Sequence, residues 1–276
     1  MTIIATTDRS SIHTAEITDT ELHATAPSIF AQSAMPGVSG KYTFLPTSRI
    51  VEAMRAEGWK PIEAKQTRPR LEIRRGFQMH MVRFQRRDVV AELDEFAPEV
   101  VLLNSHDRSS GYQIHAGMFR FVCKNGLMVA DSLIPAIHVR HTGQELNQII
   151  TASFSILAQL PKLADRVTEF RNTTLSDVAS REFATQALTL RYSDPTTAPV
   201  RAEQLLDTRR TEDAGRNLWS LTNCVSENLL RGGMKDTYRL NRAGKPFRNM
   251  RAIRGLDANV KINLGIWALA ETFRQN

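Results

Sequence analysis

The chain has 276 residues, of which 42% are hydrophobic and 24% are charged. This is enough apolar material for one sizeable core or two small ones, so disorder throughout the chain is excluded. The sequence has no run of 18 apolar residues and no signal-peptide pattern, which predicts a cytoplasmic protein without a membrane span. Two cysteines, Cys123 and Cys224, are too few for a disulfide framework or a cysteine-based zinc site.

The net charge of +7 is concentrated in two segments. Arg49–Val90 holds eleven basic and five acidic residues, a net of +6, and Arg231–Arg254 holds eight basic residues and one acidic residue, a net of +7. The other 210 residues therefore sum to −6. This distribution is typical of a surface that follows phosphates. The alternative interpretation is a pair of solvated arginine-rich faces that keep the protein soluble.

The first 40 residues are rich in small and polar side chains, and residues 24–40 carry no charge, which predicts a flexible N-terminal arm. Ser48–Gly58 has apolar residues at helical spacing and a terminal glycine, so we expect a short helix that ends at Gly58. A β-rich stretch follows, in which Gly76 marks a bulge or turn. Its apolar residues alternate with polar ones at Leu71, Ile73, Phe77, Met79 and Met81.

Two further strand signals follow. Residues 100–103 form an apolar run that ends in the polar cluster 104–111, which is typical of a strand leading into a loop. Alternating residues from Phe119 onward then lead into Asn125-Gly126. Because both central residues of a type I′ turn need positive φ, this dipeptide predicts a hairpin turn.

The second half of the chain has apolar residues at steps of three or four, which predicts amphipathic helices. These stretches are 146–157, 163–170 after Pro161, 175–190, 218–229 before Gly232-Gly233, and 260–273. The order of helix, antiparallel strands and then helices predicts the α+β class. We expect an α+β core domain at 41–192, a proline-rich loop at 193–199, and a helical C-terminal region at 200–276 that packs on the core.

The sequence lacks a phosphate-binding Walker loop, a dinucleotide fingerprint, a nucleophile elbow and a zinc-protease helix signature. We therefore expect no cofactor and no metal. Five of the seven histidines lie between residues 80 and 141, however, which leaves a metal-dependent nuclease or other hydrolase as an alternative. Its site would be Asn104, His106, Asp107 and His141. In the other interpretation, Asn104, Ser105 and Asp107 cap a tight loop by bonding its backbone.

Six stretches together carry a resemblance to a known family: Asn104–Asp107, Phe119–Leu127, His141, Arg209–Asp213, Asn217–Asn223 and Glu227–Gly233. From about Tyr42 to the C-terminus, the chain resembles the phage- and plasmid-borne family called domain of unknown function 932. The resemblance implies a mobile-element gene product of the bacterial cytoplasm. The order of the expected elements is also similar to that of single-strand annealing proteins of the Rad-fifty-two type. That second likeness implies a positively charged groove for single-stranded DNA and assembly of protomers into a ring.

We therefore expect a non-enzymatic protein of phage or plasmid origin that binds single-stranded DNA in recombination, repair or establishment of the element. Trp59 and Phe77 lie beside basic residues, as stacking platforms for bases do. The expected phosphate contacts are Arg68, Arg70, Arg74, Arg75, Arg83, Arg86 and Arg87 in the first segment, and Arg239, Arg242, Lys245, Arg248, Arg251 and Arg254 in the second. Besides the hydrolase, a host-directed interaction protein with negligible nucleic-acid affinity stays open.

Overall fold

The computed structural model describes residues 15–38, 43–86, 96–120, 125–128, 136–139, 145–236, 240–245 and 248–275. The helices are α1 (Asp19–Thr25), α2 (Thr47–Ala56), α4 (Glu145–Asn172), α5 (Asp177–Arg191), α6 (Leu218–Arg231) and α7 (Leu256–Arg274). The strands are β1 (Lys60–Gln66), β2 (His80–Gln85), β3 (Phe96–Asn104), β4 (Tyr112–Arg120), β5 (Asn125–Met128) and β6 (Ile137–Val139). Short 3-10 helices are η2 (Pro27–Phe30), η3 (Glu72–Arg74), η4 (Pro195–Thr197), η5 (Ala202–Leu206) and η6 (Thr211–Asp213). This arrangement confirms the predicted α+β class.

The strands form one antiparallel sheet in the order β1-β2-β3-β4-β5, and β6 pairs with the start of β4. His80 lies opposite Asn104, and Val101 lies opposite His115. Because successive side chains of a strand point to opposite faces, β2 sends Val82 and Phe84 to one face and Met81 and Arg83 to the other. The two faces of the sheet therefore have different neighbours.

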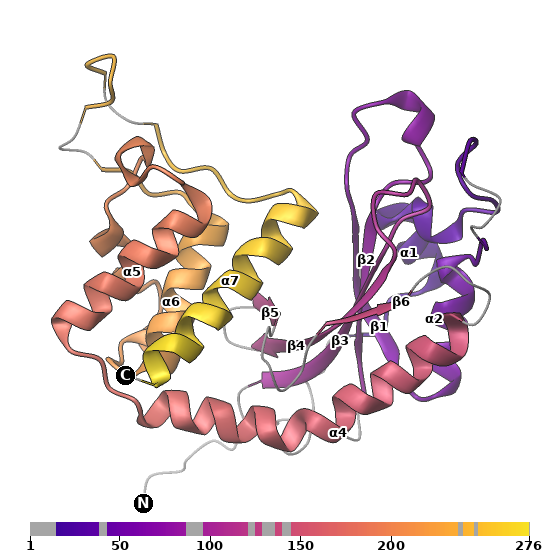
Figure 1. Cartoon of the computed structure of the whole chain (residues 1–276), viewed down its shortest axis with the longest axis horizontal. Coiled ribbons are helices and arrows are strands. Elements are labelled where there is room, and N and C mark those ends of the chain that lie inside the picture. Colours follow the sequence, from indigo (N-terminus) through magenta and orange to yellow (C-terminus); the bar gives the residue numbers. More distant parts are fainter. Residues whose placement is uncertain are drawn as a thin grey trace, which may run out of the picture.

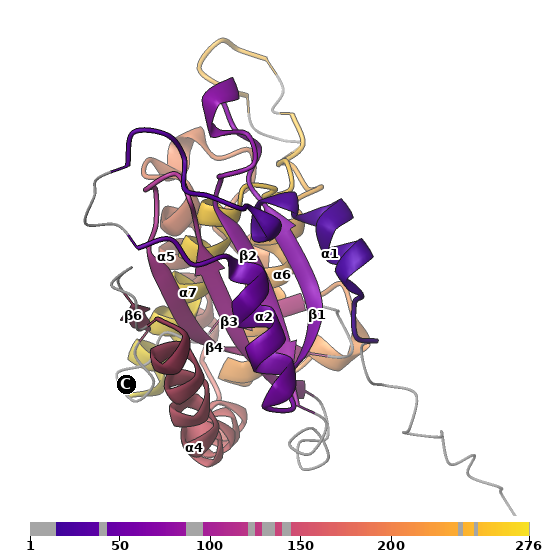
Figure 2. The same cartoon turned by 90° about the vertical axis from the view of Figure 1, so that its right-hand side faces the viewer.

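Helices α1 and α2 and the start of α4 cover one face of the sheet (Figures 1 and 2). There, Val82, Phe84 and Leu102 belong to the same buried cluster as Ile50 and Met54 of α2. On the other face, α7 meets the sheet through a smaller apolar cluster. That cluster contains Met81, Val101 and Leu103 of the sheet and Leu256, Val260 and Leu264 of α7.

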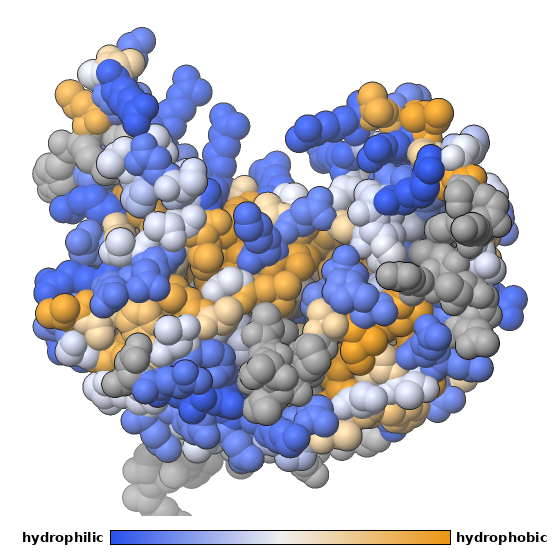
Figure 3. All heavy atoms as spheres, viewed as in Figure 1, coloured by the Kyte–Doolittle hydropathy of each residue, from blue (hydrophilic) through white to orange (hydrophobic). Residues whose placement is uncertain are grey.

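Helices α5, α6 and α7 form a helical lobe, and α4 runs beneath both this lobe and the sheet (Figure 1). Aromatic pairs fill the interior of the lobe, with ring centroids 5.1 Å apart for Phe170 and Trp267 and 5.3 Å apart for Phe183 and Phe273. The molecule is thus U-shaped, and its upper side is hollowed between the sheet and the lobe (Figure 3). Cys224 is buried in α6, whereas Cys123 lies outside the described residues.

Most predicted helix boundaries are confirmed. Helix α2 is closed by Gly58 at φ +86°, and α6 is closed by Gly232 at φ +63°. Such left-handed positions favour glycine because it has no Cβ. Helix α4 continues through Pro161, so the two apolar stripes on either side of that proline belong to one helix of 28 residues.

The strand predicted at Leu71 and Ile73 is wrong. These residues lie in the loop 67–79 between β1 and β2, around η3, and β2 begins only at His80. Gln66 of β1 and Asn104 of β3 both lie opposite His80, so both neighbouring strands end at this level. The alternating residues before His80 have no described strand to pair with. The turn predicted at Gly76 is confirmed, with φ +86°.

The predicted hairpin is confirmed in its pairing but not in the position of its turn. Asn125 and Gly126 lie inside β5, opposite Arg120 and Phe119. The connection is therefore 121–124, which lies outside the described residues. Pairing along β4 overrides the local turn preference of the Asn-Gly dipeptide.

The segment expected to be an arm contains α1 and η2. Leu22, Ala26 and Ile29 are fully buried in the main core. The amide of Ile17 donates to the carbonyl of Pro61 at 2.9 Å, which occupies part of the outer edge of β1. Residues 1–14 lie outside the described residues.

Candidate nucleic-acid interface

The hollow in Figure 3 lies between the two basic segments of the sequence. The loop 67–79 rises from the sheet, and the described residues of the segment 232–255, which leads from α6 to α7, rise from the helical lobe (Figure 1). Both tips lie on the same side of the molecule in two perpendicular views (Figure 2). We call the space between them the basic cleft.

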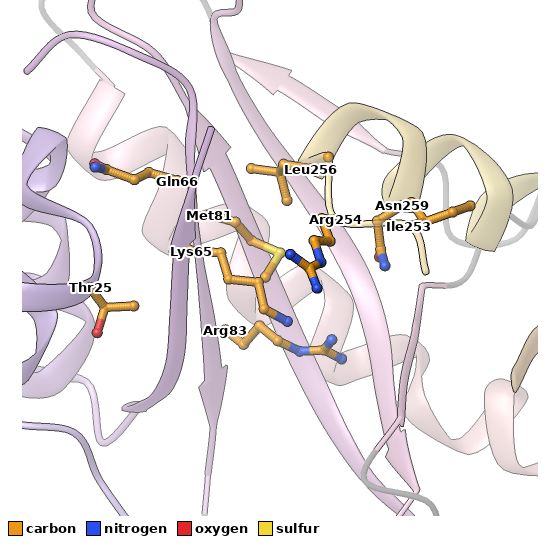
Figure 4. A pocket seen from close by; sticks show the side chains of 10 residues that line it. Thr25, Lys65, Gln66, Met81, Arg83, Ile253, Arg254, Leu256 and Asn259 are labelled. Carbon is orange, nitrogen blue, oxygen red and sulfur yellow. The ribbon is translucent and has the colours of Figure 1, made fainter. Parts of the chain in front are cut away.

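A pocket of about 390 Å³ forms the floor of the basic cleft. Lys65 and Arg83 extend from β1 and β2 toward Arg254, which precedes α7 (Figure 4). Cations from both basic segments therefore line one pocket. The other lining residues are Thr25, Gln66, Met81, Ile253, Gly255, Leu256 and Asn259.

The wall formed by 232–255 is bonded to the end of α6. The amide of Gly233 donates to Met250 at 2.7 Å, and that of Ile253 donates to Leu230 at 2.8 Å. A Cβ at Gly232 would collide with the carbonyl of Met250, so only glycine allows this close approach. Arg191 of α5 also donates to the carbonyl of Arg251, at 2.5 Å. These bonds fix the backbone that leads to Arg254.

The wall formed by 67–79 is also held by specific bonds. The amide of Phe77 donates to Arg74 at 3.0 Å, and the carbonyl of Phe77 accepts from the amide of His106 at 2.8 Å. Arg75 pairs with Glu72 at 2.5 Å, and Arg74 lies 3.5 Å from the carboxylate of Asp107. The loop thus presents its arginines on an ordered backbone.

The cations of the basic cleft divide into paired and unpaired groups. Lys65 pairs with Glu63 at 2.5 Å, and Arg242 pairs with Asp194 at 2.9 Å. Six of the cations expected to contact phosphates are exposed and have no carboxylate partner among the described residues: Arg68, Arg70, Lys245, Arg248, Arg251 and Arg254. These six carry charge that an anionic ligand could neutralise.

Arg83 lines the pocket but behaves differently. Its guanidinium is buried, and its Nε donates to Glu99 at 2.5 Å. Gln85 donates to the other oxygen of Glu99 at 2.9 Å. Burial raises the pKa of Glu99, and the charge of Arg83 opposes that rise. Because Glu99 compensates its charge, Arg83 belongs to the interior of the sheet rather than to the free charge of the cleft.

Arg86 lies at the opposite end of β2 from the loop 67–79, away from the other arginines of its segment. It donates to the carbonyl of Glu57 at 2.8 Å, and its guanidinium lies 5.8 Å and 5.7 Å from the ring centroids of Trp59 and Phe154. Trp59 itself is buried and offers no open face to a base. Arg87 and Arg239 lie outside the described residues.

The Asn104–Asp107 stretch, which carries the hydrolase alternative, turns inward. The Oγ1 of Thr47 lies 2.8 Å from Nε2 of His80 and 3.4 Å from Nε2 of His106, and it accepts from Nδ2 of Asn104 at 3.1 Å. All four side chains are fully buried. We call this set, with Ser28 and Gln66, which extend it, the His80 network. Burial lowers the pKa of His80 to about 4, so its ring is neutral near pH 7.

The rest of this loop closes on itself. Asp107 accepts from the amide and hydroxyl of Ser109 at 2.9 Å and 2.6 Å. The hydroxyl of Ser105 donates to the carbonyl of Ser110 at 2.9 Å and accepts from the amide of Ser110 at 2.8 Å. The predicted loop cap is therefore present at Ser105 and Asp107, whereas Asn104 bonds Thr47 instead of the loop backbone. His141 lies outside the described residues, and the described part of the chain holds no group of three His, Cys, Asp or Glu residues placed to bind a metal ion.

The sequence matches the family described as "Domain of unknown function (DUF932)" over residues 34–267. The chain belongs to this family. The UPF0380 proteins YfjQ and YafZ of Escherichia coli (strain K12) are 34% and 33% identical to it over 256 and 255 residues. These alignments cover 93% and 92% of this chain and 91% and 90% of the two relatives.

No solved structure matches this DUF932 chain, so the likeness to Rad-fifty-two-type annealing proteins finds no support. Within the described residues, no helix is both long and apolar enough to cross a membrane.

Two of the stretches on which the resemblance to the DUF932 family is based hold the helical lobe together. Arg209 donates to Oδ1 of Asn228 at 2.5 Å and also to the carbonyl of Gly232. Arg210 pairs with Glu227 at 3.0 Å. The motifs Arg209–Asp213 and Glu227–Gly233 thus fasten the chain before η6 to α6, close to where the wall 232–255 begins.

Proposed function

We propose that this protein binds nucleic acid in the basic cleft. The observation that supports the proposal is that parts of the two basic segments, distant in sequence, meet as the walls of one cleft, with Lys65 and Arg254 lining the pocket between them. The proposed phosphate contacts are the six unpaired cations: Arg68, Arg70, Lys245, Arg248, Arg251 and Arg254. The resemblance to phage- and plasmid-borne proteins supports a role in the cytoplasm in DNA recombination, repair or establishment of a mobile element.

The physical basis is the release of counterions. Each phosphate that a Lys or Arg neutralises frees condensed cations, so the logarithm of the association constant falls linearly with the logarithm of salt concentration. The slope is about −0.7 per contact for a single strand, so six contacts predict a slope of about −4. Arg74, Arg75 and Arg242 would add to this only by leaving their carboxylate partners.

The test measures binding of a fluorescent 20-nucleotide strand between 50 and 200 mM NaCl. The variant Arg70→Glu/Arg254→Glu reverses one cation on each wall. We expect it to bind at least tenfold more weakly than the wild type at the lowest salt and to have a slope shallower by about 1.4, because two contacts are lost.

The matched control is Arg49→Glu/Arg216→Glu, which makes the same change in net charge outside the cleft. Arg49 belongs to the first basic segment by sequence but lies on α2, which covers the opposite face of the sheet. Arg216 lies before α6 and is exposed. Equal losses in the two double variants, or a wild-type slope near zero, would remove the proposal.

A further inference from the structure

Large apolar side chains are exposed on both walls of the basic cleft. Leu71 is 57% exposed and Ile73 is 62% exposed in the loop 67–79, and Leu240 is 58% exposed in the segment 232–255. Among the described residues, only two other large hydrophobic side chains are exposed, Phe154 and Val178. Exposed apolar surface thus gathers where the basic charge also gathers.

The exposure of Leu71 and Ile73 is built into the loop. η3 lies between hydrogen bonds from Arg74 to Leu71 at 3.1 Å and from Phe77 to Arg74 at 3.0 Å. The amide of Gly76, which is in a left-handed conformation, donates a further hydrogen bond to Oε1 of Gln78 at 2.7 Å. These bonds hold the two aliphatic side chains in water, although burial would stabilise them.

The neighbours of these side chains indicate their partner. Leu71 and Ile73 lie between Arg68 and Arg70 on one side and Arg74 and Arg75 on the other. A nucleic-acid strand offers the complement of this pattern, because its phosphates are anionic while the faces of its bases are apolar. Leucine and isoleucine side chains contact bases in this way where the bases are unstacked.

We infer that the two tips contact bases, so that the preferred ligand of the cleft is a strand with unpaired bases rather than a duplex. The inference rests on the proposed function and adds the class of ligand to it. In a duplex the bases are stacked, and an apolar side chain reaches their faces only by separating a base step, which costs free energy. A single strand offers those faces without that cost.

The shape of the molecule favours a strand over a lipid surface as the partner. A flat membrane would meet the two tips, while Lys65 and Arg254 lie in the pocket between them. A strand that enters the cleft reaches both the tips and the pocket, so it uses all of the exposed cations together.

The experiment compares three ligands at one salt concentration: a 20-nucleotide thymidine strand, an abasic strand with the same phosphates, and a 20-base-pair duplex. We expect the wild type to bind the thymidine strand at least fivefold more tightly than the other two. The variant Leu71→Ser/Ile73→Ser should lose this preference and keep its affinity for the abasic strand. The control Val178→Ser, which changes an exposed side chain on α5, should keep the preference.

The outcomes separate the inference from the proposed function. Equal wild-type affinity for thymidine and abasic strands, with a steep salt dependence, would overturn base contact and leave the binding of phosphates intact. Duplex binding as tight as that of the thymidine strand would overturn the preference for unpaired bases. Binding to phosphatidylglycerol vesicles that depends on Leu71 and Ile73, without a preference for bases, would overturn the inference in favour of a membrane. Failure to bind any of the three nucleic-acid ligands would overturn both proposals.

Discussion

The loop that follows β3 and the basic cleft both gather polar side chains, but the loop bonds its side chains internally whereas the cleft leaves several cations unpaired. In the loop, Asp107 and Ser105 accept or donate within a few residues, and His106 joins the buried His80 network. In the cleft, cations such as Arg70 and Arg254 are exposed and have no carboxylate partner in the described part of the chain.

This difference separates polar side chains that stabilise the fold from polar side chains that are available to a ligand. A buried polar group is costly unless it is hydrogen-bonded, and in the His80 network the side chains bond one another, with Oδ1 of Asn104 left without a hydrogen-bond partner. Exposed cations face no such requirement, and their unneutralised charge is available to a ligand. On this basis, the buried histidines belong to the interior, and exposed arginines far apart in sequence form the candidate site.

Replacing Arg83 should have the largest effect on the free energy of unfolding. This residue lines the pocket, but its contacts with Glu99 are those of a buried ion pair. The variant Arg83→Met leaves the carboxylate of Glu99 buried beside Gln85 without its cation. Removing one partner of a buried ion pair lowers the free energy of unfolding by about 3–5 kcal/mol. Urea denaturation measures this loss, and the double variant Arg83→Met/Glu99→Met should recover most of it. A loss below about 1 kcal/mol in the single variant would place Arg83 among the free cations instead.

The pH dependence of the free energy of unfolding tests whether the His80 network is buried away from water. The pKa of His80 is about 4 in the folded chain and 6.5 in the unfolded chain, so the unfolded state gains a proton first as the pH falls. The contribution of His80 to the free energy of unfolding is therefore fully present above pH 6.5. It is lost between pH 6.5 and 4 and amounts to about 3 kcal/mol. Burial and, as the smaller cause, the neighbouring His138 together lower the pKa of His115 to about 4, which adds a loss of the same sign.

Denaturation curves at several pH values measure this dependence. The variant His80→Gln should have a shallower decline in stability between pH 6.5 and 4 than the wild type, because its share of the proton uptake is gone. The control His23→Gln changes an exposed histidine on α1 and should follow the wild-type curve. Identical curves for all three proteins would show that His80 titrates as freely as a histidine in water.

Thr47 provides a smaller test of the same network. The variant Thr47→Val preserves shape but removes the hydroxyl that meets Asn104, His80 and His106. We expect the free energy of unfolding to fall by about 2 kcal/mol, since buried groups are left without partners. The control Thr185→Val removes an exposed helical hydroxyl and should change stability by less than about 0.5 kcal/mol. If both variants behave alike, water reaches Thr47.

The sequence predicts local structure well where a residue pattern is compatible with only one kind of secondary structure. Apolar spacing gives α4 to α7, and the polar residues after Leu103 give the loop cap. The pattern fails at Leu71 and Ile73, because alternation is compatible with a strand but forms one only beside a partner strand, and β1 and β3 both end at the level of His80. The preference of the Asn125-Gly126 dipeptide for a turn also fails, because pairing with β4 places Asn125 in β5.

The sequence predicts that the candidate site is rich in arginine and lysine, but it does not predict which of these residues lie in the cleft. Two basic segments can be counted in the sequence, yet their meeting depends on α7 packing against Met81, Val101 and Leu103, which is a tertiary contact. Arg83 lies on β2 and Arg86 directly follows this strand, and only the fold sends the first to Glu99 and the second to the rings of Trp59 and Phe154.

The smallest expected effect on stability is that of the unpaired cations. The variants Arg70→Ala and Arg248→Ala remove exposed side chains with no carboxylate partner in the described residues, so each should change the free energy of unfolding by less than about 0.5 kcal/mol. Each variant should still weaken the binding of an oligonucleotide, because one phosphate contact is lost. Urea denaturation and oligonucleotide binding on the same preparations measure the two effects. Loss of stability without loss of binding would mean that these arginines support the loops. The exposed cations would then be structural, and the contrast with the buried His80 network would not hold.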